Sequence, residues 1–174
     1  MNIKNALLEL FKTVLTSLLI VIVIYFFIAM PVTISGSSMY PNLEDGEFGF
    51  AGKISLLTGI KRYDVVVIDS PKTSDKIVKR VIGLPGETLT FDGTTIFVDG
   101  EAIDDPYAYY AQVNSLDLPS GYSVTLDDDE YFVLGDNRNV SKDSRAYEDP
   151  AFKKSEIIAK GILVLFPFDE IGVH

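Results

Sequence analysis

A serine-rich turn is the first place where this chain could carry out covalent chemistry. Residues 35–41 read Ser-Gly-Ser-Ser-Met-Tyr-Pro and directly follow a long apolar run. A serine hydroxyl becomes an effective nucleophile only when a base removes its proton. The chain has no cysteine and one histidine, His174, so thiolate chemistry and histidine metal clusters are excluded, and a neutral lysine is the obvious base. Small residues before a proline are also typical of an ordinary linker or turn.

Lys79 is the lysine whose surroundings favour this role. If residues 77–82 form a strand, Ile77, Lys79 and Val81 share one apolar face. Arg80 then lies on the other face, where it can reach solvent. Burial would lower the pKa of the lysine by as much as ~3–5 units and make it a usable general base. The alternative is an edge lysine whose amine extends to water.

A third segment, dense in charges and hydroxyls, follows a short apolar strand. Residues 135–145 read Gly-Asp-Asn-Arg-Asn-Val-Ser-Lys-Asp-Ser-Arg. This composition also suits a plain solvated loop. However, Asp143 and Arg145 are spaced to form an ion pair. Ser141 could donate to a neutral lysine amine and so fix the rotamer of the base.

The apolar run before the serines predicts a membrane anchor. No charged residue occurs between residues 13 and 43. A helix over residues 11–30 would be about 30 Å long, the thickness of a bilayer core, and Pro31 marks its expected end. A buried core helix is one alternative. A cleaved signal peptide is another, but the residues that follow do not form a small-x-small cleavage site.

Charge predicts the orientation and excludes one class of partner. The 174 residues carry a net charge of −10, which argues against binding to nucleic acid. Three charged residues precede the apolar run, namely Lys4, Glu9 and Lys12, and their net charge is +1. The rest of the chain carries a net charge of −11. The positive-inside rule then places residues 1–12 in the cytoplasm, residues 13–31 in the membrane and residues 32–174 outside, as one compact domain.

The chain after the anchor reads as a mainly β domain. Short runs rich in strand-forming residues are separated by Asp-Gly and Pro-Gly turn signals, which favours an antiparallel, barrel-like or coiled sheet. The expected strands are residues 65–68, 77–82, 89–91, 94–98, 131–134 and 162–166. Residues 104–129 are acidic and turn-rich, and we expect a surface excursion between strands there.

One apolar segment after the serine turn has two interpretations. Residues 48–57 form either an ordinary strand and loop packed in the domain or an apolar rim that dips into the lipid surface. The rim would consist of Phe48, Phe50, Leu56 and Leu57.

Taken together, these segments resemble the bacterial type I signal peptidases, a family of membrane-anchored Ser/Lys proteases. Residues 35–43 are similar to the nucleophile motif of the family, and residues 79–86 to its lysine motif. Residues 135–145 match its Gly-Asp-Asn-Arg…Ser-x-Asp-Ser-Arg motif. The resemblance covers nearly the whole chain. It implies that Ser38 is the nucleophile, that the Ser38 backbone N–H binds the oxyanion, and that Lys79 is the general base. It implies supporting roles for Asp136, Ser141, Asp143 and Arg145.

Three positions depart from the common pattern of this family. Asn42 stands where threonine is common, and Val140 where asparagine is common. Gly36 occupies the place where some members have an oxyanion-hole serine, although members from Gram-positive bacteria often have glycine there. The short chain with its single anchor also resembles the Gram-positive members.

The resemblance implies that the protein removes signal peptides from exported pre-proteins at the cell membrane, after small residues of the Ala-x-Ala type. It implies no cofactor and no metal, and pre-proteins and membrane lipid as partners of a monomer. One alternative is a relative that lacks the serine or lysine and acts in pilus assembly, but both residues are present in this chain. A self-cleaving repressor of the SOS type is another, but it needs a DNA-binding domain where this chain begins with an apolar helix. An anchored binding module would not depend on Ser38 or Lys79.

Overall fold

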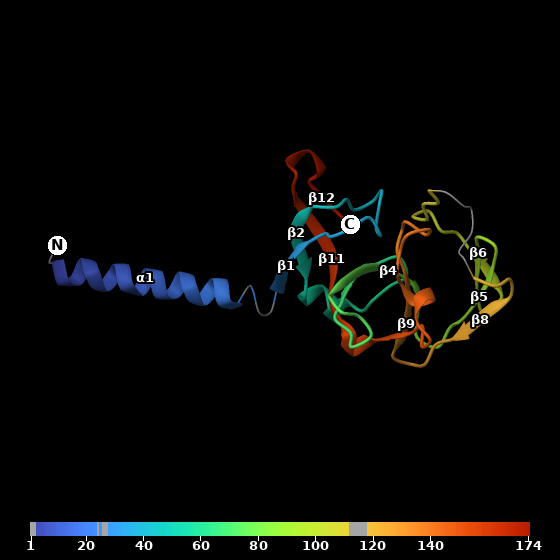
Figure 1. Ribbon diagram of the computed structural model, residues 1–174. Helices are drawn as coiled ribbons and strands as arrows, with labels where there is room; N and C mark the ends of the chain where they lie inside the picture. The colour runs from blue at the N-terminus through green and yellow to red at the C-terminus, as the bar shows by residue number, and fades with distance from the viewer. Residues whose placement is uncertain (1–2, 24, 26–27, 112–117) are drawn as a thin grey trace.

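One long helix precedes a β domain in the computed structural model, which describes residues 3–23, 25, 28–111 and 118–174. The helix, α1 (Ile3–Val23), projects away from the domain, and none of its residues is buried (Figure 1). Its most apolar 18-residue window has a mean hydropathy of 2.2. By length and composition, the helix is therefore suited to cross a membrane.

The helix differs from the sequence-based prediction at both ends. It begins at Ile3 rather than at residue 11, so the charged residues before the apolar run also lie in the helix, where Lys12 Nζ donates to Glu9 Oε1 at 2.9 Å. The prediction that the helix continues through residue 30 is wrong, because residues 29 and 30, like Pro31, lie in strand β1 (Ala29–Thr33). β1 is the edge strand of its sheet, a position where a proline without an N–H is tolerated. Residues 24, 26 and 27 lie outside the described residues.

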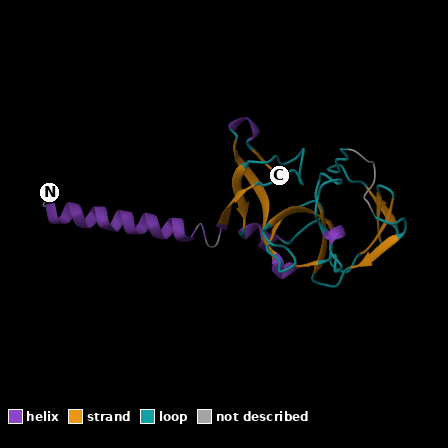
Figure 2. Cartoon of the chain, in the orientation of Figure 1, coloured by secondary structure: helices purple, strands orange, loops and turns teal. Residues whose placement is uncertain are grey.

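The larger sheet is antiparallel and carries the lysine strand. Its order is β1-β2-β11-β3-β4-β9-β10, with β12 paired to β11. Beyond β1, its strands are β2 (Phe48–Gly52), β3 (Val65–Ile68), β4 (Ile77–Gly83), β9 (Glu130–Leu134), β10 (Phe152–Lys153), β11 (Ile157–Phe166) and β12 (Gly172–Val173). Register shifts in β11 and β4 bend the sheet, which curls into a half barrel (Figure 2). The expected antiparallel coiled sheet is confirmed.

A smaller sheet of four strands packs beside the larger one. Its order is β7-β6-β5-β8, formed by β5 (Thr88–Asp92), β6 (Thr95–Val98), β7 (Glu101–Ile103) and β8 (Tyr122–Thr125). Both expected Asp-Gly turns are present, with Gly93 and Gly100 at φ values of 61° and 87°. The prediction of a surface excursion over residues 104–129 is wrong in part, because β8 pairs with β5. Residues 112–117 lie outside the described residues.

Among the described residues, three buried apolar clusters hold these layers together. One lies under the smaller sheet, around Phe91 and Phe132. Another, which contains Met39 and Leu43, lies under the serine turn. The third packs β3 against β9. Within the described residues, the domain also contains four short 3-10 helices, namely η2 (Ile54–Thr58), η3 (Ser144–Ala146), η4 (Lys154–Glu156) and η5 (Phe168–Glu170).

Candidate active site

The serine turn is held in place by the core and by a carboxylate. Met39 and Leu43 are fully buried, and the Leu43 N–H donates to the Met39 carbonyl at 3.0 Å. Gly36 adopts a φ of 83°, a conformation that favours glycine, and its N–H donates to Asp45 Oδ1 at 2.7 Å. Ser38 lies between these fixed points and is half-buried. Its hydroxyl therefore has a defined position at the domain surface.

Lys79 of β4 lies directly beside this serine. Its Nζ is 2.8 Å from Ser38 Oγ and 2.8 Å from the Val78 carbonyl oxygen. The residue is only 4% exposed, so the alternative of an edge lysine that reaches water is wrong. Burial lowers the pKa of Lys79 from 10.5 to about 8, although nearby Asp143 and Asp136 act to raise it.

This geometry can support proton transfer. A lysine with a pKa near 8 is neutral in roughly one molecule in ten at pH 7, against about one in 2500 for an unshifted lysine. The neutral amine can accept a proton over the 2.8 Å that separates it from Ser38 Oγ, a normal hydrogen-bond distance. No three histidine, aspartate or glutamate side chains in the described part of the chain gather as a metal site would require.

The loop over residues 135–145 is organised around a buried carboxylate. Asp143 is fully buried, and its Oδ2 accepts from the Gly135 N–H at 2.9 Å and from Arg145 Nη2 at 2.7 Å. Its Oδ1 accepts from Arg145 Nε at 2.8 Å. The predicted ion pair between these two residues is therefore present, and it braces the loop beside Lys79.

Ser141 does not make the expected contact with the lysine. Its Oγ is buried and has no hydrogen-bond partner among the described residues, while Lys79 Nζ is bonded to Ser38 and Val78. The hydroxyl is instead packed against Gly135, where a Cβ would collide with both the Ser141 side chain and the Ser38 carbonyl oxygen. Glycine at residue 135 is thus required for the loop to approach the serine turn this closely.

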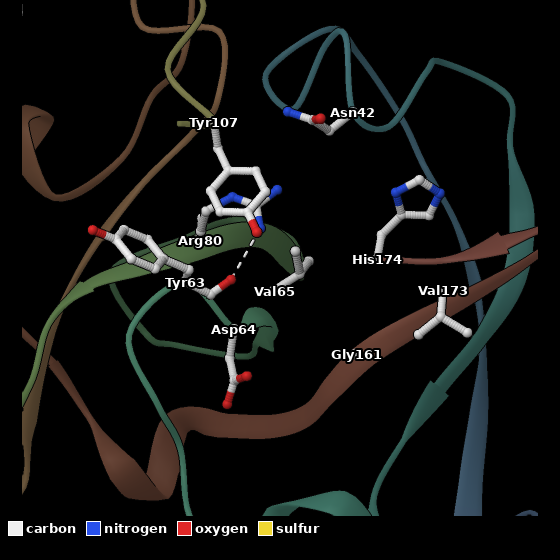
Figure 3. Close-up of a pocket in the computed structure, with 9 residues that line it drawn as sticks. All are labelled: Asn42, Tyr63, Asp64, Val65, Arg80, Tyr107, Gly161, Val173 and His174. Atoms are coloured by element: carbon white, nitrogen blue, oxygen red, sulfur yellow. Dashed lines mark hydrogen bonds between the residues drawn. The ribbon is translucent and has the colours of Figure 1, made fainter. Parts of the chain in front are cut away.

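Arg80 and Asp136 form a second buried ion pair on the opposite face of β4. Arg80 Nε lies 2.7 Å from Asp136 Oδ1, and Nη2 lies 2.6 Å from Oδ2. The expectation that Arg80 reaches solvent is wrong, because Tyr107 covers its guanidinium group. Asn42 Nδ2 also donates to Asp136 Oδ2, at 2.9 Å. Figure 3 shows Arg80 and Tyr107 at one side of a pocket, with His174 at the other side.

Asn137 is a residue of the site to which sequence reasoning assigned no role. Its backbone N–H donates to the Ser38 carbonyl at 3.0 Å, and its Nδ2 donates to the Ser37 carbonyl at 3.1 Å. In a trans peptide the C=O and N–H groups point in opposite directions. The hydrogen bond from Asn137 to the Ser37 carbonyl therefore also orients the Ser38 N–H. The sequence feature that could have pointed to this role is the position of Asn137 within the Gly-Asp-Asn-Arg motif.

A serine paired with a buried lysine in an antiparallel β domain suits a serine peptidase that works without histidine. Residues 7–166 match the family described as "Signal peptidase, peptidase S26". The chain is 35% identical to signal peptidase I of Bacillus licheniformis, over 98% of this chain and 94% of that protein. It is 35% identical to signal peptidase IB of Staphylococcus aureus, over 96% and 93% respectively.

A crystal structure of a signal peptidase I from Enterococcus faecalis is also similar to the chain, with 30% identity and a TM-score of 0.47, covering 58% of this chain and 95% of that one. The family match and the curated relatives confirm the expected family. The chain belongs to the signal peptidase family, peptidase S26, and is a serine peptidase.

Proposed function

We propose that the chain is a membrane-bound endopeptidase that removes N-terminal signal peptides from exported pre-proteins, cleaving after small residues of the Ala-x-Ala type. The observation that carries this proposal is the 2.8 Å contact between Lys79 Nζ and Ser38 Oγ in a member of the signal peptidase family. The buried lysine supplies the base, and the serine supplies the nucleophile.

The proposed reaction is acyl transfer through Ser38. Neutral Lys79 takes the hydroxyl proton while Ser38 Oγ attacks the carbonyl carbon before the scissile bond. The Ser38 N–H, whose peptide Asn137 orients, donates to the oxyanion that forms. Protonated Lys79 then gives its proton to the leaving amine. Finally, Lys79 takes a proton from a water molecule that attacks the acyl-serine, and returns that proton to Ser38 Oγ as the ester bond breaks and the signal peptide is released.

An extended substrate has a suitable place beside this pair. β4 pairs with β9 only from Arg80 onward, so residues 77–79 have no strand partner on that side within the described chain. A peptide in extended conformation could bond to these backbone groups as an added strand. Its scissile carbonyl would then pass close to Ser38, because Lys79 is both part of that edge and in contact with the serine.

The substrate preference is the direct test of this proposal. Detergent-solubilised full-length protein is expected to cut a pre-protein once, after the Ala-x-Ala sequence, as read by N-terminal sequencing of the product. Replacing the alanine before the cut by leucine should abolish that cut, because the site would have to admit a larger side chain. Cleavage at the same bond in both substrates would contradict the small-residue preference.

We further propose that the catalytic domain lies on the outer membrane surface with its anchor end in the lipid interface. The N-terminal segment is positively charged and the remainder is strongly acidic, which favours a cytoplasmic N-terminus. Seven exposed apolar side chains form an apolar patch on β2, β11, η5, β12 and the residue between the last two, namely Phe48, Phe50, Leu163, Phe166, Phe168, Ile171 and Val173.

The apolar patch is continuous because the strand register aligns its members. Phe50, Leu163 and Val173 lie opposite one another on three neighbouring strands, and Phe48 lies opposite Phe166. These strands lie at the end of the domain where α1 joins it (Figure 1). Of the rim expected from sequence, Phe48, Phe50 and Leu57 are exposed, whereas Leu56 packs against the core and does not belong to the rim.

Removing apolar area from the patch should weaken lipid binding. A truncated protein that begins at Ala29, and so keeps β1 whole, is expected to float with phosphatidylcholine vesicles. Phe168→Asp, at a side chain that is 78% exposed, should reduce this binding. The lost transfer free energy of a phenylalanine is about 1.5–3 kcal/mol, or roughly tenfold or more in partitioning. Vesicle flotation measures the change.

A matched control separates the patch from general surface hydrophobicity. Val140→Asp replaces an exposed apolar residue in the loop after β9, outside the patch, and should leave flotation unchanged. If the Phe168→Asp protein binds vesicles as well as its parent, the patch does not contact lipid.

A further inference from the structure

A tyrosine-rich segment that follows strand β7 of the smaller sheet contacts all three segments that form the site. Residues 104–110, which we call the tyrosine strap, follow β7. The Tyr109 N–H donates to the Asp136 carbonyl at 2.8 Å, and the Tyr109 carbonyl accepts from the Arg138 N–H at 2.9 Å. The ring of Tyr109 also meets the ring of Tyr40, in the serine turn, at 5.3 Å.

The strap reaches the lysine strand through Tyr107. The ring of Tyr107 lies over the guanidinium group of Arg80, with 3.7 Å between its centroid and Arg80 Cζ (Figure 3). The edges of this guanidinium are occupied by the Asp136 carboxylate and by the Tyr63 carbonyl, the latter at 2.9 Å. A guanidinium donates hydrogen bonds only in its plane, so the aromatic ring covers the face that those bonds leave open.

The residue held by Arg80 is adjacent to the residue that holds the nucleophile. Asp136 is fixed by Arg80 and also accepts from Asn42, four residues after Ser38. The next residue, Asn137, donates to the carbonyls of Ser37 and Ser38. A shift of Asp136 would therefore move the two donors that set the orientation of the serine peptide.

We propose that Tyr107 is a positioning residue of the peptidase: by stacking on Arg80 it keeps Asp136 in place, and Asp136 in turn keeps Asn137 bonded to the serine turn. This inference rests on the proposed function of Ser38 and Lys79. It assigns a role in the chemistry to a residue that lies outside the three motifs and touches neither catalytic side chain in the described structure.

The arrangement also has an electrostatic consequence that a purely structural role would lack. The charges that act on Lys79 are Asp143 and Asp136, which raise its pKa, and Arg145, which lowers it. Arg80 neutralises Asp136. If Arg80 loosens, its positive charge offsets less of the negative charge that the Asp136 carboxylate exerts on Lys79. The pKa of Lys79 then rises. The acid limb of the pH–rate profile should then move to higher pH.

The test compares Tyr107→Leu, Tyr107→Phe and wild type in the full-length, detergent-solubilised protein. Tyr107→Leu keeps apolar volume but removes the aromatic face, and it should lower kcat by about 10- to 100-fold through misplacement of the serine peptide. Its acid limb should shift upward while KM changes little. Tyr107→Phe retains the ring and should restore both kcat and the pH profile. Tyr122→Leu removes a half-buried tyrosine that packs on Phe91 in the smaller sheet. This control should lower the melting temperature without moving kcat.

Each other outcome overturns either this inference or the function on which it rests. The inference fails if Tyr107→Leu behaves like Tyr122→Leu, if Tyr107→Phe does not restore kcat and the pH profile, or if the rate of Tyr107→Leu falls equally at every pH. Should Tyr107→Leu not fold, Tyr107→Met is judged by the same criteria. If neither folds, Tyr107 serves stability alone and the inference is wrong. If wild type cleaves no faster than Ser38→Ala, the proposed function itself fails.

Discussion

Full-length protein carrying Ser38→Ala or Lys79→Arg is expected to cleave a pre-protein at least about 10³-fold more slowly than wild type, because the two residues act as one unit. Ser38→Ala lacks the nucleophile. Lys79→Arg keeps a cation near Ser38 Oγ but cannot act as the base, since guanidinium does not deprotonate in proteins. Rates of product formation with a pre-protein substrate measure both losses.

The wild-type rate should also rise with pH in a manner set by the lysine. Because the reactive form is neutral and the pKa of Lys79 is lowered to about 8, the rate should increase about tenfold per pH unit below that value and level off above it. At pH 6 it should be about one hundredth of the plateau.

A neighbouring lysine provides the control for these variants. Lys76 lies just before β4, is about half-exposed and pairs with Asp69 at 2.6 Å. Lys76→Arg makes the same chemical change away from the serine and should leave the rate and its pH dependence unaltered. Activity retained in Lys79→Arg, or an acid limb near pH 6, would disprove the assignment of Lys79 as the base.

The largest stability effect is expected from the buried ion pair in the loop after β9. Asp143→Ala leaves the guanidinium of Arg145, whose side chain is only 8% exposed, without its carboxylate. Removing one partner of such a pair costs about 3–5 kcal/mol, which corresponds to a fall of about 6–20 °C in Tm for a domain of this size. Thermal melting followed by circular dichroism measures this loss.

Two comparisons give this prediction its specificity. Asp69→Ala breaks the half-exposed pair with Lys76 and should change the free energy of unfolding by less than about 1 kcal/mol. Asp143 also acts to raise the pKa of Lys79. In the fraction of Asp143→Ala that still folds, the acid limb should therefore move to lower pH. Equal melting temperatures for Asp143→Ala and wild type would mean that the pair does not brace the site.

The local features of the fold could be predicted from sequence because their causes lie within a few residues. The Asp-Gly turns at Gly93 and Gly100 need only a glycine at positive φ between two strand-forming runs. The alternation along β4 likewise placed Lys79 on an apolar face, where it is found buried. A chain without cysteine and with one histidine also limited the possible bases before any contact was known.

Other features depend on which elements meet in space, and local patterns do not encode that. Strand periodicity placed Arg80 on the opposite face of β4. It could not predict that Arg80 is buried there, because that burial depends on Tyr107 packing across the face. The end of the helix was misplaced because Pro31 pairs with Phe50 in a sheet rather than following a helix. In the same way, the contact of Ser141 depended on how the loop packs against Gly135.

The sequence by itself determined which residues can supply the proposed chemistry and the class of the fold, whereas the tertiary structure decided how the candidate site is held. Ser38 and Lys79 are 41 residues apart and Asn42 and Asp136 are 94 apart, yet each pair is hydrogen-bonded. Residue type and short-range spacing select which groups can react. Their orientation comes from contacts between distant segments, because only the packed sheets bring the serine turn, the lysine strand and the tyrosine strap together.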